Sequence, residues 1–152
     1  KKYRMGVTVL EEIKITPLKK IMLETGDVYK GLEKNDKNFT KFGELYFSFI
    51  NFNKIKAWKK HNSMKMNLIV PIGKVKFVFF CENNKNFREE IIGTDNYSRL
   101  TIPPNVWFGF MGLEKPKSLI VNLASICHDD NEVNRLEINN NLIKYSWENL
   151  WR

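Results

Sequence analysis

The chain has 152 residues, yet it contains no long apolar run and only two cysteines and two histidines. No apolar stretch approaches the ~20 residues that a membrane-spanning helix needs. The apolar stretch within residues 1–10 is too short for a signal peptide. We therefore expect a cytoplasmic protein without a membrane partner. Because Cys81 and Cys127 form no CxxC pair, we expect buried thiols in a reducing compartment rather than a disulfide.

The same scarcity limits the partners that the chain can bind. Two cysteines and two histidines give no zinc-ligand spacing, so we expect no metal. The net charge of +8 comes from lysines scattered among asparagines rather than clustered. Because the charge is scattered, we do not expect a nucleic acid as the partner. A basic barrel could equally attract a nucleotide diphosphate.

What the chain does have is apolar and aromatic content, at 43% and 13% of its residues. This is enough for a core built on aromatic packing. Short β-like runs alternate with Gly, Pro and Asn, a pattern typical of one all-β barrel or sandwich domain over residues 1–152. The predicted strands are Val7–Ile15, Asp27–Leu32, Gly43–Phe52, Ile55–Trp58, Met66–Pro71, Glu89–Ile92, Arg99–Ile102, Trp107–Met111 and Ser118–Ala124.

Three local patterns add detail to this prediction. Residues 43–52 are apolar at both alternating sets of positions, so this strand is either buried on both faces or lines a cavity. Residues 68–80 contain a Pro-Ile-Gly turn and predict a hairpin. Residues 130–135 have an acidic start and predict a short helix or turn.

Three stretches carry a family resemblance. They are Ile-Thr-Pro at 15–17 with Glu-Thr-Gly-Asp-Val at 24–28, Lys-Ala-Trp-Lys at 56–59 with residues 61–75, and Leu-Thr-Ile-Pro-Pro-Asn-Val-Trp-Phe-Gly-Phe at 100–110. In order and spacing they resemble the DxRG-type turn, the RGxH segment with its hairpin, and the IPxGxxHGF strand of the dTDP-4-dehydrorhamnose 3,5-epimerase (RmlC-like cupin) family. The resemblance spans roughly residues 13–147.

This resemblance implies a cupin-type jelly-roll β-barrel that forms a homodimer and binds a nucleotide-linked 4-keto-6-deoxy sugar. In that family a His–Asp dyad removes the proton alpha to the ketone, and a tyrosine reprotonates the opposite face, without a metal or redox cofactor. Such chemistry needs a positioned base and a group that holds the enolate. The resemblance further implies a role in surface-polysaccharide sugar biosynthesis.

The predicted catalytic residues are His61 and Lys59. Lys59 stands at the position of the family's histidine, and an ordinary lysine with a pKa near ~10.4 is protonated at neutral pH. His61 follows two residues later, and strand alternation puts both side chains on one face. The alternative interpretation is that residues 59–61 form a solvated rim.

Other family positions are replaced in this sequence. The reprotonating tyrosine falls at Ile126 or Cys127, near His128, which is either a substitute acid or a loop residue. Thr25 stands where the DxRG arginine contacts the nucleotide, and Phe108 stands where GxxHGF has its histidine.

The remaining site predictions concern binding. Lys56 keeps the charge of the RGxH arginine and is expected to hold the enolate or the phosphates. Trp58 and Trp107 either stack on a base or sugar or belong to the core. Polar residues on apolar strands indicate a cavity. The predicted substrate-binding residues are Lys56, Trp58, Ser48, Asn67, Trp107 and Thr25.

The sequence therefore favours a nucleotide-sugar epimerase or keto-isomerase that acts by proton abstraction alpha to a ketone. The alternative is a catalytically inactive cupin that binds a sugar nucleotide or a partner protein.

Overall fold

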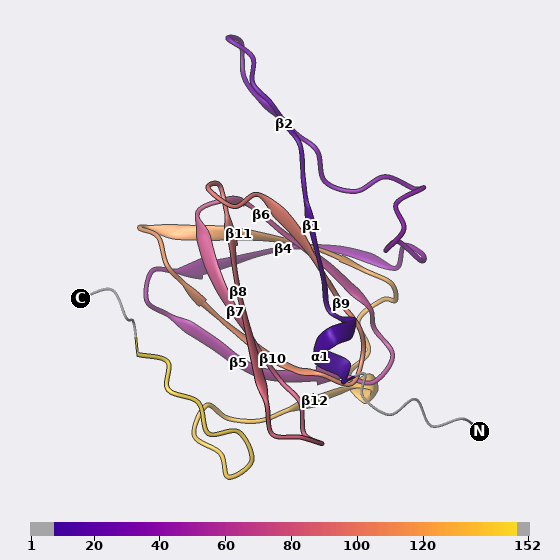
Figure 1. Ribbon diagram of the computed structural model, residues 1–152, viewed down its shortest axis with the longest axis vertical. Coiled ribbons are helices and arrows are strands. Elements are labelled where there is room, and N and C mark those ends of the chain that lie inside the picture. The colour runs from indigo at the N-terminus through magenta and orange to yellow at the C-terminus, as the bar shows by residue number, and fades with distance from the viewer. Residues whose placement is uncertain (1–7, 149–152) are drawn as a thin grey trace.

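The computed structural model describes residues 8–148, which form two five-stranded antiparallel sheets facing each other around a barrel (Figure 1). The strand order is β1-β9-β6-β11-β4 in the first sheet and β12-β5-β10-β7-β8 in the second. A separate pair, β2 and β3, projects away from the barrel. The arrangement is the predicted all-β jelly roll.

The element bounds follow. The first sheet contains β1 (Lys14–Pro17), β9 (Ser98–Ile102), β6 (Met66–Ile72), β11 (Lys117–Ala124) and β4 (Glu44–Asn51). The second contains β12 (Val133–Arg135), β5 (Ile55–His61), β10 (Trp107–Gly112), β7 (Lys74–Phe80) and β8 (Phe87–Gly93). The projecting pair is β2 (Lys20–Ile21) and β3 (Val28–Tyr29), and the helical turns are α1 (Val9–Glu12) and a 3-10 turn at Asp130–Glu132.

Most predicted strands are confirmed to within a few residues at either end, but the first two are not. Residues 9–12 form α1 and only residues 14–17 form a strand, so the prediction of one strand over Val7–Ile15 is wrong. Val7 itself lies outside the described residues. In the predicted strand Asp27–Leu32, only Val28 and Tyr29 pair. The short helix or turn at residues 130–135 is confirmed for its first three residues, and β12 takes the rest.

The hairpin predicted at residues 68–80 is also wrong. β6 pairs with β9 and β11, whereas β7 pairs with β10 and β8, so the chain crosses from one sheet to the other at Gly73. Gly73 has φ +92°, and a Cβ there would lie 2.1 Å from Ser118 Oγ. A strand that is hydrogen-bonded to a neighbour on both sides is more stable than a strand in an isolated two-stranded hairpin, and this explains the crossover.

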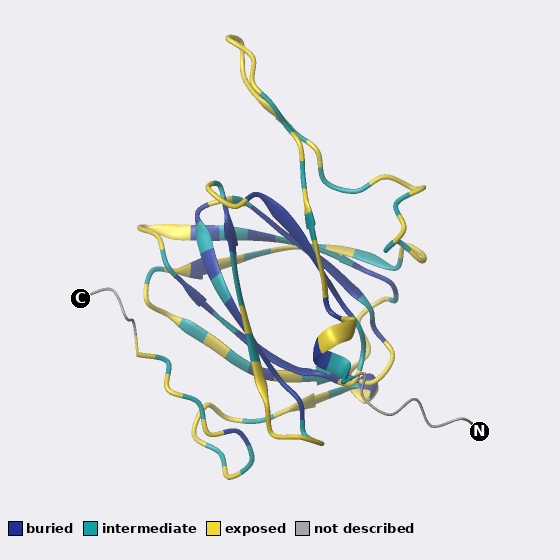
Figure 2. Cartoon of the chain, in the orientation of Figure 1, coloured by how far each residue is buried: buried dark blue, intermediate teal, exposed yellow. Residues whose placement is uncertain are grey.

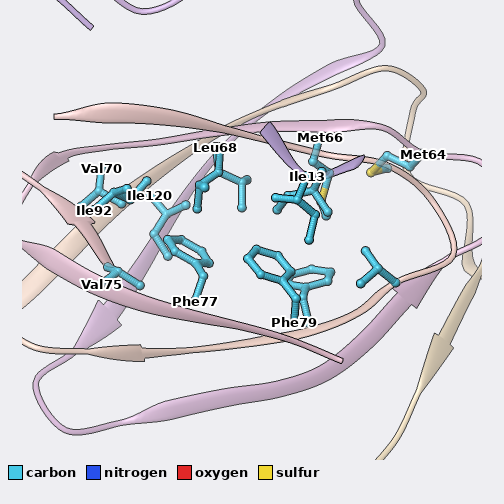
Figure 3. Packing of buried hydrophobic residues seen from close by; sticks show 14 of the residues in the cluster. Ile13, Met64, Met66, Leu68, Val70, Val75, Phe77, Phe79, Ile92 and Ile120 are labelled. Atoms are coloured by element: carbon cyan, nitrogen blue, oxygen red, sulfur yellow. The ribbon is translucent and has the colours of Figure 1, made fainter. Parts of the chain in front are cut away.

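The main core lies between the two sheets (Figure 3). Phe77 and Phe79 of β7 meet Leu68 and Val70 of β6, and all four are buried. Full burial of such a side chain stabilises the fold by about 1.5–3 kcal/mol. The aromatic packing expected between the sheets is therefore present.

A second apolar cluster covers the outer face of the second sheet. Trp58 and Trp107 pack there with Ile143, Tyr145 and Trp147 of the C-terminal segment. Because the second sheet is covered on both faces, the continuous apolar run of β7 has buried positions on each side.

The first sheet is covered differently. On its edge strand β4, alternate residues point into the barrel, while Leu45, Phe47 and Phe49 point outward and are exposed. The strand predicted to be buried on both faces or to line a cavity therefore lines one with its inner face only.

The described cysteines form no disulfide. Cys81 is buried as predicted, whereas Cys127 is exposed, and the prediction of burial is wrong for it. Among residues 8–148, no helix has the length and apolar character to cross a bilayer.

Gly73 gives a test of the crossover. We expect Gly73→Ala to lower the free energy of unfolding by about 3 kcal/mol, because it combines an unfavourable φ with overlap on Ser118. The control is Gly26→Ala, which has φ +134° but no atom within 4 Å of the new Cβ. We expect it to cost about 1 kcal/mol in urea unfolding. Equal losses for the two variants would contradict the proposed packing at Gly73.

Candidate functional site

The two sheets enclose a cavity of about 870 Å³, which is within the usual range for small-ligand sites. Its walls come from β4 and β11 on one side and from β5, β10 and residues 135–137 on the other. Lining residues with polar or charged side chains are Tyr46, Ser48, Lys56, Lys59, His61, Asn122, His128, Arg135 and Glu137.

A bulge in β5 brings three basic side chains to this cavity. The β5–β10 register shifts between Phe108, which pairs with Lys59, and Gly109, which pairs with Ala57, so the residue between them is extra. Lys56 pairs with Phe110 beyond the bulge. Strict alternation would put residues 56 and 59 on opposite faces, but one extra residue returns them to the same face. Lys56, Lys59 and His61 consequently all line the cavity.

His61 is buried, with 9% of its surface exposed, and it is paired with a carboxylate. Its Nδ1 hydrogen-bonds Glu132 Oε1. The ring also stacks on Phe108, with 6.1 Å between centroids. When the carboxylate accepts the Nδ1 proton, the neutral ring keeps its lone pair on Nε2. The structure therefore places a buried, carboxylate-paired imidazole at the cavity, and the solvated-rim alternative does not fit His61.

Glu132 is itself anchored by the backbone. Its Oε2 accepts hydrogen bonds from the amides of Ser63 (3.0 Å) and Met64 (3.1 Å). Burial raises the pKa of this carboxyl, but the hydrogen bonds from His61, Ser63 and Met64 outweigh burial and hold the pKa below its ordinary value. The carboxylate thus stays ionised where it orients the imidazole.

Three cationic side chains line the same wall as His61, and they are Lys56, Lys59 and Arg135. Arg135 of β12 pairs with Lys59 of β5, and Lys56 Nζ donates to the Phe49 carbonyl at 2.8 Å. Burial, followed by the charges of Arg135 and Lys56, lowers the pKa of Lys59. Burial is the larger cause, and the smaller part that comes from repulsion by Arg135 and Lys56 is the part that an anionic ligand would relieve. The arrangement favours a phosphate or an enolate.

The facing wall is polar but uncharged. Tyr46 and Ser48 of β4 and Asn122 of β11 line it. Ser48 lines the cavity as predicted. Asn122 Oδ1 is buried there without a hydrogen-bond partner among the described residues.

The structure does not bring the two predicted tryptophans to the ligand space. The Trp107 indole donates to Glu82 and lies under Lys60, outside the cavity. Trp58 contributes to the wall, but its ring is only 1% exposed and packs on Tyr145 and Trp147. Neither ring offers a free face for stacking, because the bulge and the C-terminal segment turn both into the outer cluster.

Asn67 and Thr25 also lie away from the cavity. Asn67 is on the outer face of β6, where its amide bonds Thr101 Oγ1 at 2.6 Å and the Asn38 carbonyl at 3.4 Å. The segment that contains Asn38 thus provides a hydrogen-bond partner for the Asn67 side chain, which was predicted to bind the ligand. Thr25 is exposed in the turn of the projecting β2–β3 pair.

Several residues of the site were not predicted from the sequence. Glu132 is 71 positions from His61, and no spacing connects the two. Arg135 was not identified either, whereas Tyr46 and Asn122 could have been found as polar residues at inward positions of apolar strands. His128 also lines the cavity. Its side chain is half exposed, and its Nε2 lies 2.9 Å from Asp130 Oδ1.

Comparisons with models of known families and with curated proteins give no match. Solved structures do match. A dTDP sugar isomerase from Desulfovibrio desulfuricans has 30% identity and a TM-score of 0.86, covering 93% of this chain and 94% of that one. The sugar 3,4-ketoisomerase QdtA from Thermoanaerobacterium thermosaccharolyticum, in complex with TDP, has 21% identity and a TM-score of 0.71, covering 84% and 90%.

A dTDP-4-dehydrorhamnose 3,5-epimerase from Bacillus anthracis, with TDP and PPi bound, shares the fold at 15% identity and a TM-score of 0.77, covering 94% of this chain and 88% of that one. The barrel is thus a cupin of the type found in sugar-nucleotide isomerases and epimerases. The chain belongs to the RmlC-like cupin family.

Glu132→Gln tests the pairing with His61. At pH 7 we expect it to lower the free energy of unfolding by about 2 kcal/mol, because charged hydrogen bonds are lost. A carboxyl with a lowered folded pKa stabilises the fold above its unfolded pKa, and this stabilisation disappears as the pH falls through the folded value. The difference from the unmodified protein should therefore shrink below pH 4.5.

The control is Glu137→Gln, at an exposed glutamate in the same cavity wall. We expect little change in stability at any pH from this variant. If the loss of unfolding free energy in Glu132→Gln stays constant down to pH 3, the charge of the Glu132 carboxylate does not contribute to stability.

Proposed function

We propose that the protein is an isomerase of nucleotide-linked 4-keto-6-deoxy sugars and that His61 removes the proton alpha to the ketone. The observation that carries the proposal is the buried His61–Glu132 pair at a cavity whose wall also holds three cations. A carbon acid beside a ketone needs a neutral base and a positive group for the enolate, and this wall contains both.

In the proposed step, His61 Nε2 accepts the proton from the carbon next to the carbonyl. The electrons of the C–H bond form the enolate double bond, and the carbonyl oxygen takes the negative charge. Glu132 stabilises the imidazolium that forms, as the aspartate of a Ser-His-Asp triad does in hydrolases. Return of a proton from solvent to the opposite face of the same carbon gives an epimer. Transfer of the proton from the His61 imidazolium to the former carbonyl carbon, while the hydroxyl on the neighbouring carbon loses its proton and the enolate oxygen gains one, gives a shifted ketone. Neither route changes the overall oxidation state of the sugar, so the proposed reaction needs no redox cofactor.

Lys56, Lys59 and Arg135 have the charge for the enolate and the diphosphate. Lys59, predicted as a catalytic residue, is proposed here as an electrostatic group rather than the base, because a bound anion would favour its charged form. The neighbouring structures described as bound to TDP support this substrate class. We further propose that the reaction takes place in the cytoplasm and supplies a sugar for surface polysaccharide.

Solvent exchange tests the proposed function. Incubated with dTDP-4-keto-6-deoxyglucose in deuterated water, the protein should incorporate deuterium at a carbon next to the ketone, as followed by NMR. We expect His61→Asn to reduce exchange by a factor of at least about 10², the usual contribution of a general base. His128→Asn, which changes the other histidine of the cavity wall, should retain more exchange.

Two outcomes would contradict the proposal. Exchange that survives in His61→Asn would remove His61 as the base. No exchange with this substrate, together with retained binding, would favour the alternative of an inactive cupin that holds a sugar nucleotide.

We also propose that the protein acts as a homodimer. The outer face of β4 exposes 64% of Phe47 and 49% of Phe49, beside an unpaired sheet edge. The segment that projects with β2 and β3 is mostly exposed (Figure 2), and its exposed residues include Met22 and Val28. Apolar patches and bare edges on one chain indicate an interface. A two-fold contact would let the arm of each copy cover the apolar face of the other.

Phe47→Glu tests this interface. We expect it to convert the dimer to a monomer in sedimentation equilibrium, because a charge would be buried without a partner. The matched control is Ile138→Glu at another exposed apolar position, which should leave the dimer intact. A protein that is monomeric at micromolar concentration, or a Phe47→Glu variant that stays dimeric, would overturn the assignment.

A further inference from the structure

The C-terminal segment, residues 136–148, contacts the bulge of β5. Trp58, the extra residue of the bulge, has no register partner on β10. Its backbone pairs with Leu136 instead. The Trp58 amide donates to the Leu136 carbonyl at 2.9 Å, and the Leu136 amide donates to the Trp58 carbonyl at 3.1 Å. The extra residue of a bulge is ordinarily left unpaired in its ladder. Here the C-terminal segment provides both of its hydrogen bonds.

Side chains of the same segment pack on the outer side of the bulge. The ring centroids of Trp147 and Trp58 lie 5.3 Å apart, and Tyr145 contacts both rings. Gly109 and Ala57 are register partners beside the bulge. A Cβ on Gly109 would lie 3.1 Å from Trp147 Cζ2 and 2.6 Å from Ala57 Cβ. Trp147 therefore lies directly against the bulge, and the glycine is what allows this close approach.

The half of β5 that contains His61 has separate anchors. Lys60 Nζ lies 3.0 Å from Glu82 Oε1 and 5.1 Å from the ring centroid of Trp107. The backbone of His61 pairs with β12. None of these contacts is made by residues 136–148. A change in the C-terminal segment should therefore act on the other half of β5, which contains Lys56.

The bulge decides which face of β5 carries Lys56. A strand that slips by one residue turns every side chain to the opposite face. If the bulge closes into a regular ladder while the His61 half stays in register, Lys56 turns away from the cavity. Lys59 and His61 keep their places, so the cavity wall loses one of its cations.

We propose that Trp147 is a positioning residue of the anion site. It holds the β5 bulge from outside the cavity, and the bulge keeps Lys56 on the same wall as Lys59 and His61. Its effect on a ligand is transmitted through Trp58, on which its indole packs. The inference rests on the proposed function, because it takes these cations to hold the diphosphate of the substrate.

Calorimetry with pyrophosphate tests the inference without a sugar or a base. We expect Trp147→Ala to raise the Kd of pyrophosphate roughly tenfold, because the charged contact of Lys56 is lost. The matched control is Phe87→Ala. Phe87 packs on Tyr145 with 5.3 Å between centroids, but β10 and β7 separate its strand from β5. We expect this control to change the Kd less than twofold. Equal losses for the two variants would overturn the inference, because a general loosening of the outer cluster would explain both.

A second variant changes the bulge from β10 and keeps every aromatic ring. Gly109→Ala brings a Cβ against Ala57 and Trp147. We expect it to weaken pyrophosphate binding by a similar factor, and this result decides the matter where Trp147→Ala does not fold. Unchanged affinity in the folded variants would overturn the inference.

Two NMR readouts separate positioning from a loss of structure. The deshielded proton expected between His61 and Glu132 should remain in Trp147→Ala, because that end of β5 has its own anchors. The amides of Trp58 and Leu136 should exchange with deuterated water at least about tenfold faster than in the unmodified protein, because the segment that pairs them is loosened. Loss of the His61 signal, or unchanged exchange of both amides, would overturn the inference.

The proposed function would fail in a different way. If the unmodified protein does not bind pyrophosphate, the cationic wall is not a diphosphate site and the proposed function is contradicted. Faster exchange of the Trp58 amide in Trp147→Ala would then still support Trp147 as the residue that holds the bulge.

Discussion

The carboxylate of Glu132 fixes which nitrogen of His61 carries a proton, and the chemistry proposed for this barrel depends on that contact. A buried imidazole without such a partner could face the cavity with either tautomer. Here the backbone amides of Ser63 and Met64 hold Glu132, and Phe108 stacks on the ring. The pair therefore has little freedom to rotate. Its rigidity is of the kind that a base needs to act on a weak carbon acid.

The two sheets contribute different chemistry to the cavity. The second sheet brings Lys56, Lys59 and Arg135, and it does so because a bulge in β5 returns Lys56 to the inner face. The first sheet brings the neutral polar side chains of Tyr46, Ser48 and Asn122. A cavity with one cationic wall and one neutral polar wall suits a ligand with a diphosphate at one end and a polyhydroxyl ring at the other. A plain anion or a purely apolar ligand would leave one wall unused.

Much of the fold could be predicted from local patterns, because period-two alternation depends only on neighbouring residues. The same alternation correctly put Lys59 and His61 on one face. The prediction of a hairpin at residues 68–80 was wrong because a local sequence pattern indicates a turn but does not indicate which strands pair with each other. Trp107 and Asn67, both predicted to bind the substrate, do not line the cavity, because segments distant in sequence cover the outer faces of the sheets on which they lie. Glu132 meets His61 only through tertiary structure, so no local pattern could have identified it.

The chain has only two histidines, so nitrogen-15 NMR of the labelled protein can test the His61 tautomer directly, with His128→Asn giving the assignment. At a pH where the ring is neutral, our account predicts a protonated Nδ1 with a strongly deshielded proton, an unprotonated Nε2, and loss of the deshielded signal in Glu132→Gln. An Nε2-protonated ring that is insensitive to Glu132→Gln would contradict the account, because the base would then have no lone pair facing the cavity.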